Sequence, residues 1–478
     1  MSEICLYWFK RDLRVFDNFA LFKAISFGDV IPIYIVEPNL WSLPDHSYRQ
    51  WEFCRECILD LEKQLIDIGL KLIIRVGDAK IILEDFIDNF QVKNVFSHEG
   101  TGNYWTYQRD KGLRKSFKSK NIKWSEFQQF GVIRGVKNRD NWSSLWENFM
   151  IKPLIKPSYC NVSTLINIDE LQSENKLPTS KELNLTCDNC YERQIGGRSN
   201  ALKRMDLFFN HKLDKYSYSI SNPKYALDGC SRLSPYISFG CISLREVFQK
   251  LRKHKKVKNA LESRLHWHCH FIQKLEQKPE LEFNDFHPYF SNIRNYNNSF
   301  LTAWRDGATG YPFLDACMRC LDRKGWINFI MRAMLMSFAS YDLWLPWQNT
   351  GLILAKKFVD FEPGIHWMQC QMQSGTTSIN SLRIYNPVKQ SIDFDPNGDF
   401  IKKWVPELRN LPSTYIHEPW EIDLLIDSCY KIKLGEDYPY PIVNHKDSIK
   451  IAKKRIREVR EQKGYTMISE NILKKFGS

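Results

Sequence analysis

The pattern of the chain changes after about residue 130, and this change limits the folds open to it. Before that point, short apolar runs alternate with segments of helical periodicity. The predicted strands are residues 4–9, 30–36, 71–76 and 92–97, and the predicted helices are residues 48–68, 79–90 and 104–119. Such alternation is typical of a parallel sheet with crossover helices. From residue 196 onward the pattern indicates helices and loops, with few strand signals.

The length of the chain supports a division into domains. At 478 residues it is too long for a single core. We expect an α/β domain over residues 1–130, a connector with prolines and polar runs over 131–195, and an all-α domain over 196–478. KRDLR, rather than a glycine-rich loop, follows the first predicted strand, so the standard dinucleotide-binding fingerprint is absent.

Charge and cysteine content narrow the class of protein. The formal net charge is +13 and the pI is about 9.0, which suits a polyanionic partner such as nucleic acid, although a merely basic protein fits equally well. No apolar run approaches the roughly 20 residues that span a bilayer, and the N-terminus lacks a signal-peptide pattern. We therefore expect a cytoplasmic protein with no membrane partner, whose 13 cysteines are mostly reduced thiols.

Residues 304–420 combine aromatic rings with charged groups. Seven of the 15 tryptophans lie there, among Arg332, Asp360, Glu362 and His366. Burying charges among rings is unfavourable unless each charge is paired or binds a polar ligand. The stretch therefore predicts a helical pocket around a large, flat cofactor with polar edges.

Residues 229–240 read GCSRLSPYISFG and contain two serines and an arginine before a proline. Small hydroxyls, backbone amides and a cation at an expected helix start are suited to bind phosphate. The alternative is an ordinary capped helix with Ser231 or Ser234 as its N-cap. The residue types leave both interpretations open.

Several further motifs follow one another in a fixed order. They are WFKRDLRVFDN at 8–18, GCSRLSPYISFG at 229–240, TGYPFLDACMR at 309–319, GWIN at 325–328, DFEPGIH at 360–366, RIYNP at 383–387 and WVPEL at 404–408. Together they resemble the DNA photolyase/cryptochrome flavoprotein family, of which the chain looks like an atypical, bacterial-type member. The match covers essentially the whole chain. It implies a Rossmann-like parallel-sheet antenna domain, a long connector and a C-terminal helical FAD-binding domain.

The resemblance implies which residues bind FAD. The positions that match those holding the phosphates and the ribityl chain are Tyr218, Ser231, Arg232, Leu233 and Ser234. Cys230 stands where the family usually has threonine, which puts one hydroxyl contact in doubt.

Other positions match residues around the flavin ring. Arg332 and Asp360 match an ion pair beside the isoalloxazine, and Glu362 replaces the usual aspartate nearby. His366 falls at the position facing flavin N5, where asparagine is common in photolyases. A neutral and a charged imidazole would bias the flavin differently, because a cation favours the anionic reduced ring.

The function implied is that of a deoxyribodipyrimidine photolyase, a carbon–carbon lyase driven by blue light. In that family, excited reduced FAD passes an electron to a pyrimidine lesion that is flipped out of UV-damaged DNA. The implied DNA or substrate contacts are Arg264, Trp267, His268, Phe329, Gln390, Lys402 and Lys403.

Some of these positions depart from the pattern of cyclobutane photolyases. Arg264 replaces a glutamate, Phe329 and Ile330 replace an Asn-Arg pair, and Met372 replaces an aromatic residue. The lesion type therefore stays open. A cryptochrome-type blue-light photoreceptor without repair activity is the alternative.

The expected catalytic residues are Trp347, His366 and Trp267. Trp347 matches the middle member of a three-tryptophan electron relay, whereas Cys370 stands at the flavin-proximal position and the surface position falls near Arg294. A path through Trp344, Trp367 and Tyr296 is one alternative, and a role in core packing alone is another.

Further expectations concern other ligands and partners. We expect no metal site, because His266, His268 and His270 do not share one helix face and lack a carboxylate partner. An antenna chromophore, methenyl-tetrahydrofolate or a deazaflavin, would lie near residues 97–110, where Glu99 and Asn103 either contact a pterin or cap the next helix. The protein is expected to be a monomer associated with the nucleoid.

Overall fold

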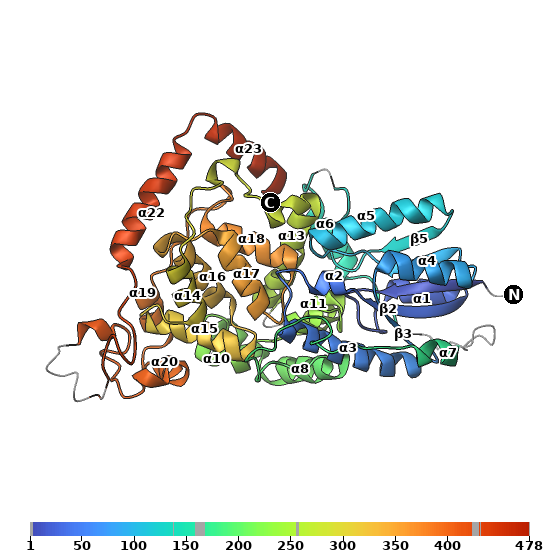
Figure 1. Cartoon of the computed structure of the whole chain (residues 1–478), viewed down its shortest axis with the longest axis horizontal. Coiled ribbons are helices and arrows are strands. Elements are labelled where there is room, and N and C mark those ends of the chain that lie inside the picture. Colours follow the sequence, from blue (N-terminus) through green and yellow to red (C-terminus); the bar gives the residue numbers. More distant parts are fainter. Residues whose placement is uncertain are drawn as a thin grey trace.

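The computed structural model describes residues 3–136, 138–157, 168–254, 258–422, 430 and 432–477. A sheet domain is followed by a helical domain (Figure 1). Within the described residues the sheet is parallel throughout, with the strand order β3-β2-β1-β4-β5. The strands are β1 (Ile4–Phe9), β2 (Asp29–Val36), β3 (Ile73–Val76), β4 (Asn94–His98) and β5 (Lys123–Phe127). The predicted fold class is confirmed.

Alternating side chains place β1 between two hydrophobic layers. Leu6 and Trp8 point to one face and join the core formed with α4 (Ala79–Asn89) and α5 (Tyr104–Ser119). Tyr7 and Phe9 point to the other face, where α1 (Phe19–Phe27) and α3 (Tyr48–Ile66) cover them. Because both faces are buried, the central strands are almost continuously apolar.

The second hydrophobic layer does not stop at the sheet domain. The same core continues from Tyr7 and Trp51 to Phe208, Phe248 and Cys269 in the helical domain. The two domains therefore share buried apolar surface rather than meeting across a polar interface.

Helices make up most of the described chain outside the sheet. The remaining α-helices of the sheet domain and connector are α2 (Pro38–Trp41), α6 (Trp142–Met150) and α7 (Ile168–Ser173). Those that follow are α8 (Arg198–His211), α9 (Tyr216–Ser219), α10 (Pro223–Gly229), α11 (Ser234–Ser238), α12 (Leu244–Arg252), α13 (Lys258–Gln277), α14 (Asn298–Asp306), α15 (Pro312–Lys324), α16 (Phe329–Ser337), α17 (Trp347–Lys357), α18 (Pro363–Ser374), α19 (Pro387–Phe394), α20 (Asp399–Trp404), α22 (His445–Arg460) and α23 (Tyr465–Phe476).

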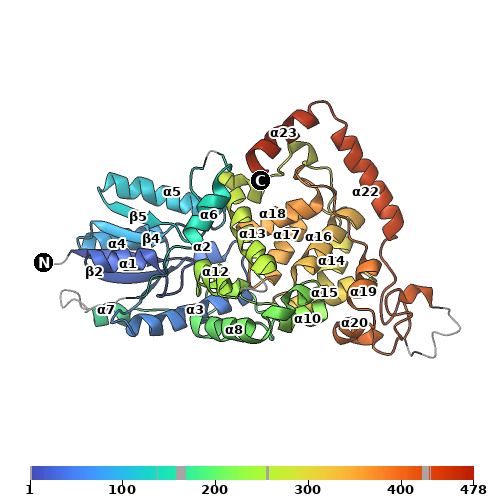
Figure 2. The same ribbon diagram turned by 180° about the vertical axis from the view of Figure 1, so that it is seen from behind.

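The helical domain is arranged around α16, α17 and α18. Seen from either side, α22 and α23 run along its outer edge, and α13 lies between α18 and the sheet domain (Figure 2). Gly364 lets α18 approach α13 closely, because a Cβ atom there would lie 2.6 Å from the Ile272 Cα. No helix in the described parts of the chain is both long and apolar enough to cross a membrane.

Candidate functional site

A cavity of about 280 Å³ lies within the helical domain. Its walls come from the loop before α11, from α13, and from α16 to α18. The structure brings eight of the predicted flavin-binding residues to this cavity: Ser231, Arg232, Leu233, Ser234, Arg332, Asp360, Glu362 and His366. Three of the predicted substrate contacts line it as well: Arg264, His268 and Phe329.

Tyr218 is the flavin-binding prediction that the structure does not bring to the cavity. Its side chain is 66% exposed and contacts the Tyr225 ring. Tyr216, two residues earlier in the chain, lines the cavity instead. Both tyrosines lie in α9, and the turn of the helix decides which of them faces inward. Matching a sequence motif does not resolve that difference.

Other predicted residues also lie outside the cavity lining. Trp267 does not line the cavity, because its side chain points away from the α13 face that carries Arg264 and His268. It is 43% exposed and packs against the rings of His270 and Phe271. The remaining predictions outside the lining are Trp347, Gln390, Lys402 and Lys403.

Arg232 is buried at one end of the cavity. Its guanidinium lies 4.3 Å from the Trp326 ring, and its Nε donates to the Gln194 Oε1 atom at 3.0 Å. Burial and nearby Arg204 lower the pKa of Arg232 to about 10, so the side chain stays a cation at neutral pH. A buried cation paired only with amide groups and a ring is suited to bind an anionic group of a ligand.

Arg204 fixes the loop that carries Arg232. Its guanidinium donates to the carbonyl oxygens of Asp228 at 3.0 Å, Cys230 at 2.5 Å and Ser231 at 2.9 Å. These bonds turn three carbonyl groups of the 228–231 segment toward α8. The loop therefore enters the cavity in one defined conformation.

Arg332 and Asp360 form the predicted ion pair. The Nη2 atom of Arg332 lies 2.9 Å from the Asp360 Oδ2 atom, and its Nε donates to the Ile327 carbonyl. Within the described parts of the chain, the other Asp360 oxygen has no hydrogen-bond partner, and the same holds for one oxygen of Glu362. Burial raises the pKa of Glu362, and the ion pair with Arg11 opposes that rise.

Unpartnered polar atoms gather on this cavity. Leaving such an atom buried without a hydrogen bond costs about 1–3 kcal/mol. A ligand with donors and acceptors along its edge would satisfy them, as the ring system of a flavin does. The atoms are the oxygens Asn328 Oδ1, Asp360 Oδ1, Glu362 Oε1 and Gln373 Oε1, and the nitrogen Gln369 Nε2.

Asn328, Gln369 and Gln373 were not predicted from the sequence. Gln369 and Gln373 follow Ile365 at intervals of four residues, so all three share one face of α18. This four-residue spacing is the sequence signal that could have predicted Gln369 and Gln373 as cavity residues. Asn328 belongs to the GWIN motif, which was recognised without assigning a role to it.

His366 is neutral in this structure. Burial lowers its pKa to about 4, with nearby Arg332 acting in the same direction. Its Nε2 atom lies 2.8 Å from the Gly351 carbonyl oxygen, so a proton on Nε2 is donated there. Of the two charge states considered above, the uncharged imidazole is the one that faces the cavity.

Aromatic rings lead away from the cavity behind His366. The His366 ring lies 4.8 Å from the Trp367 ring, which lies 6.1 Å from the Trp347 ring. Both indoles are buried, and Trp347 donates to the Asp285 Oδ1 atom at 2.7 Å. Cys370 lines the cavity at the position considered for a relay tryptophan, and burial raises the pKa of its thiol.

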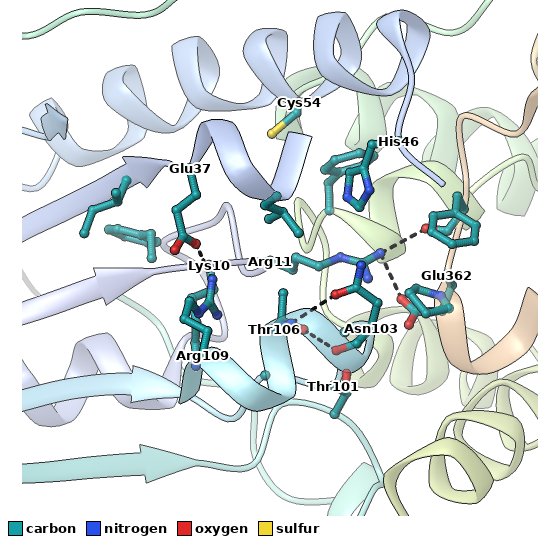
Figure 3. A pocket seen from close by; sticks show the side chains of 18 of the residues that line it. Lys10, Arg11, Glu37, His46, Cys54, Thr101, Asn103, Thr106, Arg109 and Glu362 are labelled. Carbon is teal, nitrogen blue, oxygen red and sulfur yellow. Dashed lines mark hydrogen bonds and ion pairs between the residues drawn. The ribbon is translucent and has the colours of Figure 1, made fainter. Parts of the chain in front are cut away.

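A second cavity, of about 110 Å³, lies at the carboxyl ends of β1, β2 and β4 (Figure 3). This is the edge of a parallel sheet at which ligands usually bind. Its aromatic lining comes from both domains: Trp8, Phe9, Tyr34, Trp41, Phe130, Phe239 and Phe361.

Charged side chains also border the second cavity. Arg109 pairs with Glu37 and lies 4.7 Å from the Trp8 ring. Glu99 and Asn103 line the cavity too. The Asn103 Oδ1 atom accepts from the Thr106 amide at 3.1 Å, so Asn103 does cap α5 while facing the cavity.

The fold and the first cavity together define a protein built to hold a flavin dinucleotide between helices, beside a parallel-sheet domain. Residues 5–134 match the family model described as DNA photolyase, and residues 261–458 match the FAD binding domain of DNA photolyase. The chain belongs to the DNA photolyase/cryptochrome family, and it carries that family's FAD-binding domain.

Relatives include both branches of the family. The chain is 26% identical to the deoxyribodipyrimidine photo-lyase of Alkalihalophilus pseudofirmus, over 92% of this chain and 94% of that protein. It is 24% identical to Cryptochrome-1 of Rattus norvegicus, over 97% of this chain and 83% of that protein. An archaeal photolyase from Sulfolobus tokodaii, solved with two FAD molecules, superposes with a TM-score of 0.79 at 26% identity, over 95% of this chain and 100% of that one.

Proposed function

We propose that this protein is a blue-light-dependent photolyase that repairs pyrimidine lesions in UV-damaged DNA. FAD bound in the first cavity supplies the light-driven electron transfer. The residues that would hold it are those of the loop at 230–234 and the Arg332–Asp360 pair. The other residues are those with unpartnered polar atoms: Asn328 before α16, Glu362 before α18, and Gln369 and Gln373 in α18.

One observation carries the proposal of a macromolecular substrate. Arg264 lines the flavin cavity and is exposed at the surface, with its guanidinium 4.8 Å from the Phe329 ring. A flipped-out base needs an apolar ring to stack on and a cation beside its phosphate. Arg264 and Phe329 supply both at the place where the cavity reaches solvent.

The net charge of +13 supports DNA as the partner. Of the basic residues predicted to contact DNA, Lys403 is exposed and Lys402 is partly exposed on α20. Part of another basic run, residues 255–257 of the segment 250–258, lies outside the described residues.

The test is a repair assay with purified, FAD-loaded and photoreduced protein. Oligonucleotides carrying one cyclobutane dimer or one (6-4) photoproduct are illuminated with blue light, and lesion loss is measured by chromatography. We expect loss of one lesion in light and none in darkness. An Arg264→Ala variant should keep its FAD and weaken binding to lesion DNA at least tenfold. If neither lesion is repaired in light, the proposed activity is wrong.

A cryptochrome-type photoreceptor is the second candidate, and one observation favours it. Cys370 lies where a relay tryptophan would face the flavin, and its thiol is 3.5 Å from His366 Nε2. A thiol with a raised pKa is a poor electron donor, so light would have to reduce the flavin by another route. A light-induced change in hydrodynamic radius or protease sensitivity, without repair, would support this candidate.

We further propose that the second cavity holds an antenna chromophore. Its aromatic walls and the Glu37–Arg109 pair suit a flat ring system with polar edges. The Sulfolobus tokodaii photolyase, solved with two FAD molecules, supports a second chromophore in a protein of this fold. Apoprotein would be incubated in turn with FAD, a deazaflavin and methenyl-tetrahydrofolate, and the released chromophores counted. Binding of a single equivalent of FAD and nothing else would contradict this proposal.

A further inference from the structure

The two cavities share a wall that is made by very few residues. Phe361 and Glu362 line both of them, at the start of α18. From the sheet domain, Arg11 reaches across this wall toward Glu362 (Figure 3). Its Nη2 atom lies 3.0 Å from the Glu362 Oε2 atom.

The side chain of Arg11 is bound by the helical domain. Its Nε donates to the Ser238 carbonyl at 2.9 Å, and its Nη2 donates to the Phe361 carbonyl at 3.1 Å. With the Glu362 carboxylate, these groups fix the guanidinium at three points. A guanidinium held in this way keeps one position relative to the cavity behind it.

The backbone that delivers Arg11 is rigid. Buried Asp12, next to it, accepts hydrogen bonds from the Tyr7 hydroxyl at 2.5 Å and from the Lys10 amide at 2.8 Å, and it lies 2.8 Å from His98 Nδ1. The Gln129 side chain donates to the Arg11 carbonyl at 2.6 Å. The charge of Arg11 is therefore presented to the wall by a hydrogen-bonded segment that directly follows β1.

Glu362 is the group through which that charge reaches the flavin cavity. Its side chain is 3% exposed, and Glu362 belongs to the cavity lining. Its second oxygen, Oε1, has no hydrogen-bond partner among the residues that the structure describes. Without a nearby cation, a carboxylate so deeply buried would disfavour a flavin that gains negative charge on reduction. With Arg11 in place, the pair is neutral overall.

We propose that Arg11 is a positioning residue of the flavin site: it neutralises Glu362 and thereby sets the reduction potential of the bound FAD from the sheet domain. Because Arg11 also lines the second cavity, an occupant of that cavity would act on the flavin through the same pair. The inference rests on FAD binding in the first cavity, which the proposed function shares, but it does not require repair activity.

A charge cycle tests the proposal on FAD-loaded protein at one fixed pH. Wild type carries a neutral pair, Glu362→Gln leaves one extra positive charge, and Arg11→Met combined with Glu362→Gln restores neutrality. We expect Glu362→Gln to raise the ratio of reduced to oxidised FAD at least tenfold at a fixed solution potential. For a two-electron couple this is about 30 mV. The double variant should lose at least half of that shift.

Arg11→Lys is the matched control, because it keeps the charge while changing the geometry, and its ratio should stay within twofold of wild type. If Glu362→Gln shifts the ratio less than twofold, or if the double variant keeps the full shift, the inference is wrong. Thermal melts of wild type and the three variants distinguish a loss of folded protein from a change in the reduction potential of FAD. If Glu362→Gln gives the expected change in the FAD ratio but the wild-type protein repairs no lesion, the proposed function alone is wrong. If the protein repairs a lesion but Glu362→Gln leaves the FAD ratio unchanged, this inference alone is wrong.

Discussion

Arg232 combines burial with a backbone conformation that arginine seldom adopts. Its φ is 54°, in the left-handed region, and its side chain is held by Gln194 and Trp326. A non-glycine residue keeps such a conformation only when its surroundings fix it, and strain of this kind gathers at functional sites. The sequence predicts Arg232 among the residues that hold the FAD phosphates and ribityl chain. Neither the backbone strain nor the Arg204 contacts behind the loop have a sequence signature.

His366 makes stability depend on pH. Its folded-state pKa is about 4 and its unfolded value about 6.5, so the unfolded chain binds the extra proton first. The contribution is present above pH 6.5 and is lost as pH falls toward 4. Between pH 7 and pH 5, His366 should account for about 2 kcal/mol of lost stability.

Urea unfolding of the apoprotein at both pH values measures this effect. A His366→Gln variant should lose less stability on acidification than wild type. His211→Gln, at an exposed position of α8, is the control and should behave as wild type. Equal pH dependence in the His366 variant and wild type would contradict the prediction.

Trp367 and Trp347 are expected to carry the electron that reduces the flavin. Their rings are 6.1 Å apart and lead from His366 to the Asp285 hydrogen bond. Replacing either indole by phenylalanine should slow photoreduction of bound FAD at least tenfold, because phenylalanine is far harder to oxidise. Transient absorption after a blue flash measures the rate. Trp404→Phe, a buried indole outside the cavity lining, should change it little, and an equal slowing there would refute a specific path.

At the scale of elements, α18 supplies a large part of the site. Glu362 precedes its first residue, and Ile365, His366, Gln369 and Gln373 follow along one face. The helix also approaches α13 closely through Gly364, where an added Cβ would meet the Ile272 backbone. The width of the cavity between these two helices therefore depends on one glycine.

Gly364→Ala should force α18 away from α13. We expect a loss of about 1–3 kcal/mol in stability, as for overpacked cores, together with weaker FAD binding. Gly112→Ala is the matched control: this glycine of α5 has open space around its Cα, so alanine should stabilise by about 0.5–1 kcal/mol. Chemical denaturation and FAD titration measure both effects. Unchanged FAD affinity in Gly364→Ala would contradict this account of the cavity.

The elements differ in how well the sequence predicts them. Strands β1 to β4 overlap the four predicted strands, and the apolar runs of β1 and β2 report burial on both faces. Strand β5, KWSEF, was not predicted, because it pairs with β4 at the sheet edge and is partly exposed, so its sequence shows no clear strand alternation. Helix α1 was also not predicted, because it is apolar almost throughout and shows no clear helical periodicity of hydrophobic residues. In the site, motif order predicted the loop at 230–234 and the Arg332–Asp360 pair. Which of Tyr216 and Tyr218 faces the cavity depends on the rotation of the short helix α9, which the sequence motif does not report. The wall shared by the two cavities depends on how the domains pack together, so it could not be predicted from the sequence either.

At the scale of the whole molecule, the two domains are joined by core and by side-chain contacts. Gln50 of α3 donates to the Ala355 and Phe358 carbonyls at the end of α17, and Arg49 donates to the Lys357 carbonyl. The continuous core beside them also crosses the boundary. Neither domain can unfold without exposing apolar surface of the other.

The chain should therefore unfold in one cooperative transition, although its two halves have different folds. Scanning calorimetry of the FAD-loaded protein should give equal calorimetric and van't Hoff enthalpies. A Gln50→Ala change removes two buried hydrogen bonds at the boundary and should lower the melting temperature while keeping a single peak. Two resolved peaks in wild type would show that the domains are independent.

The position of the second cavity has an evolutionary consequence. Its lining comes largely from loops that follow strands, whereas the sheet itself is formed by the apolar residues inside the strands. On the proposal that this cavity holds an antenna chromophore, mutations in those loops can change which chromophore binds, and with it the wavelengths absorbed, without disturbing the folding of the sheet. Only the wall formed by Phe361 and Glu362 resists such drift, because a change there alters both sites at once. Under the same proposal, the absorption range of the protein and the chemistry of its flavin site can change independently in evolution, except at this shared wall.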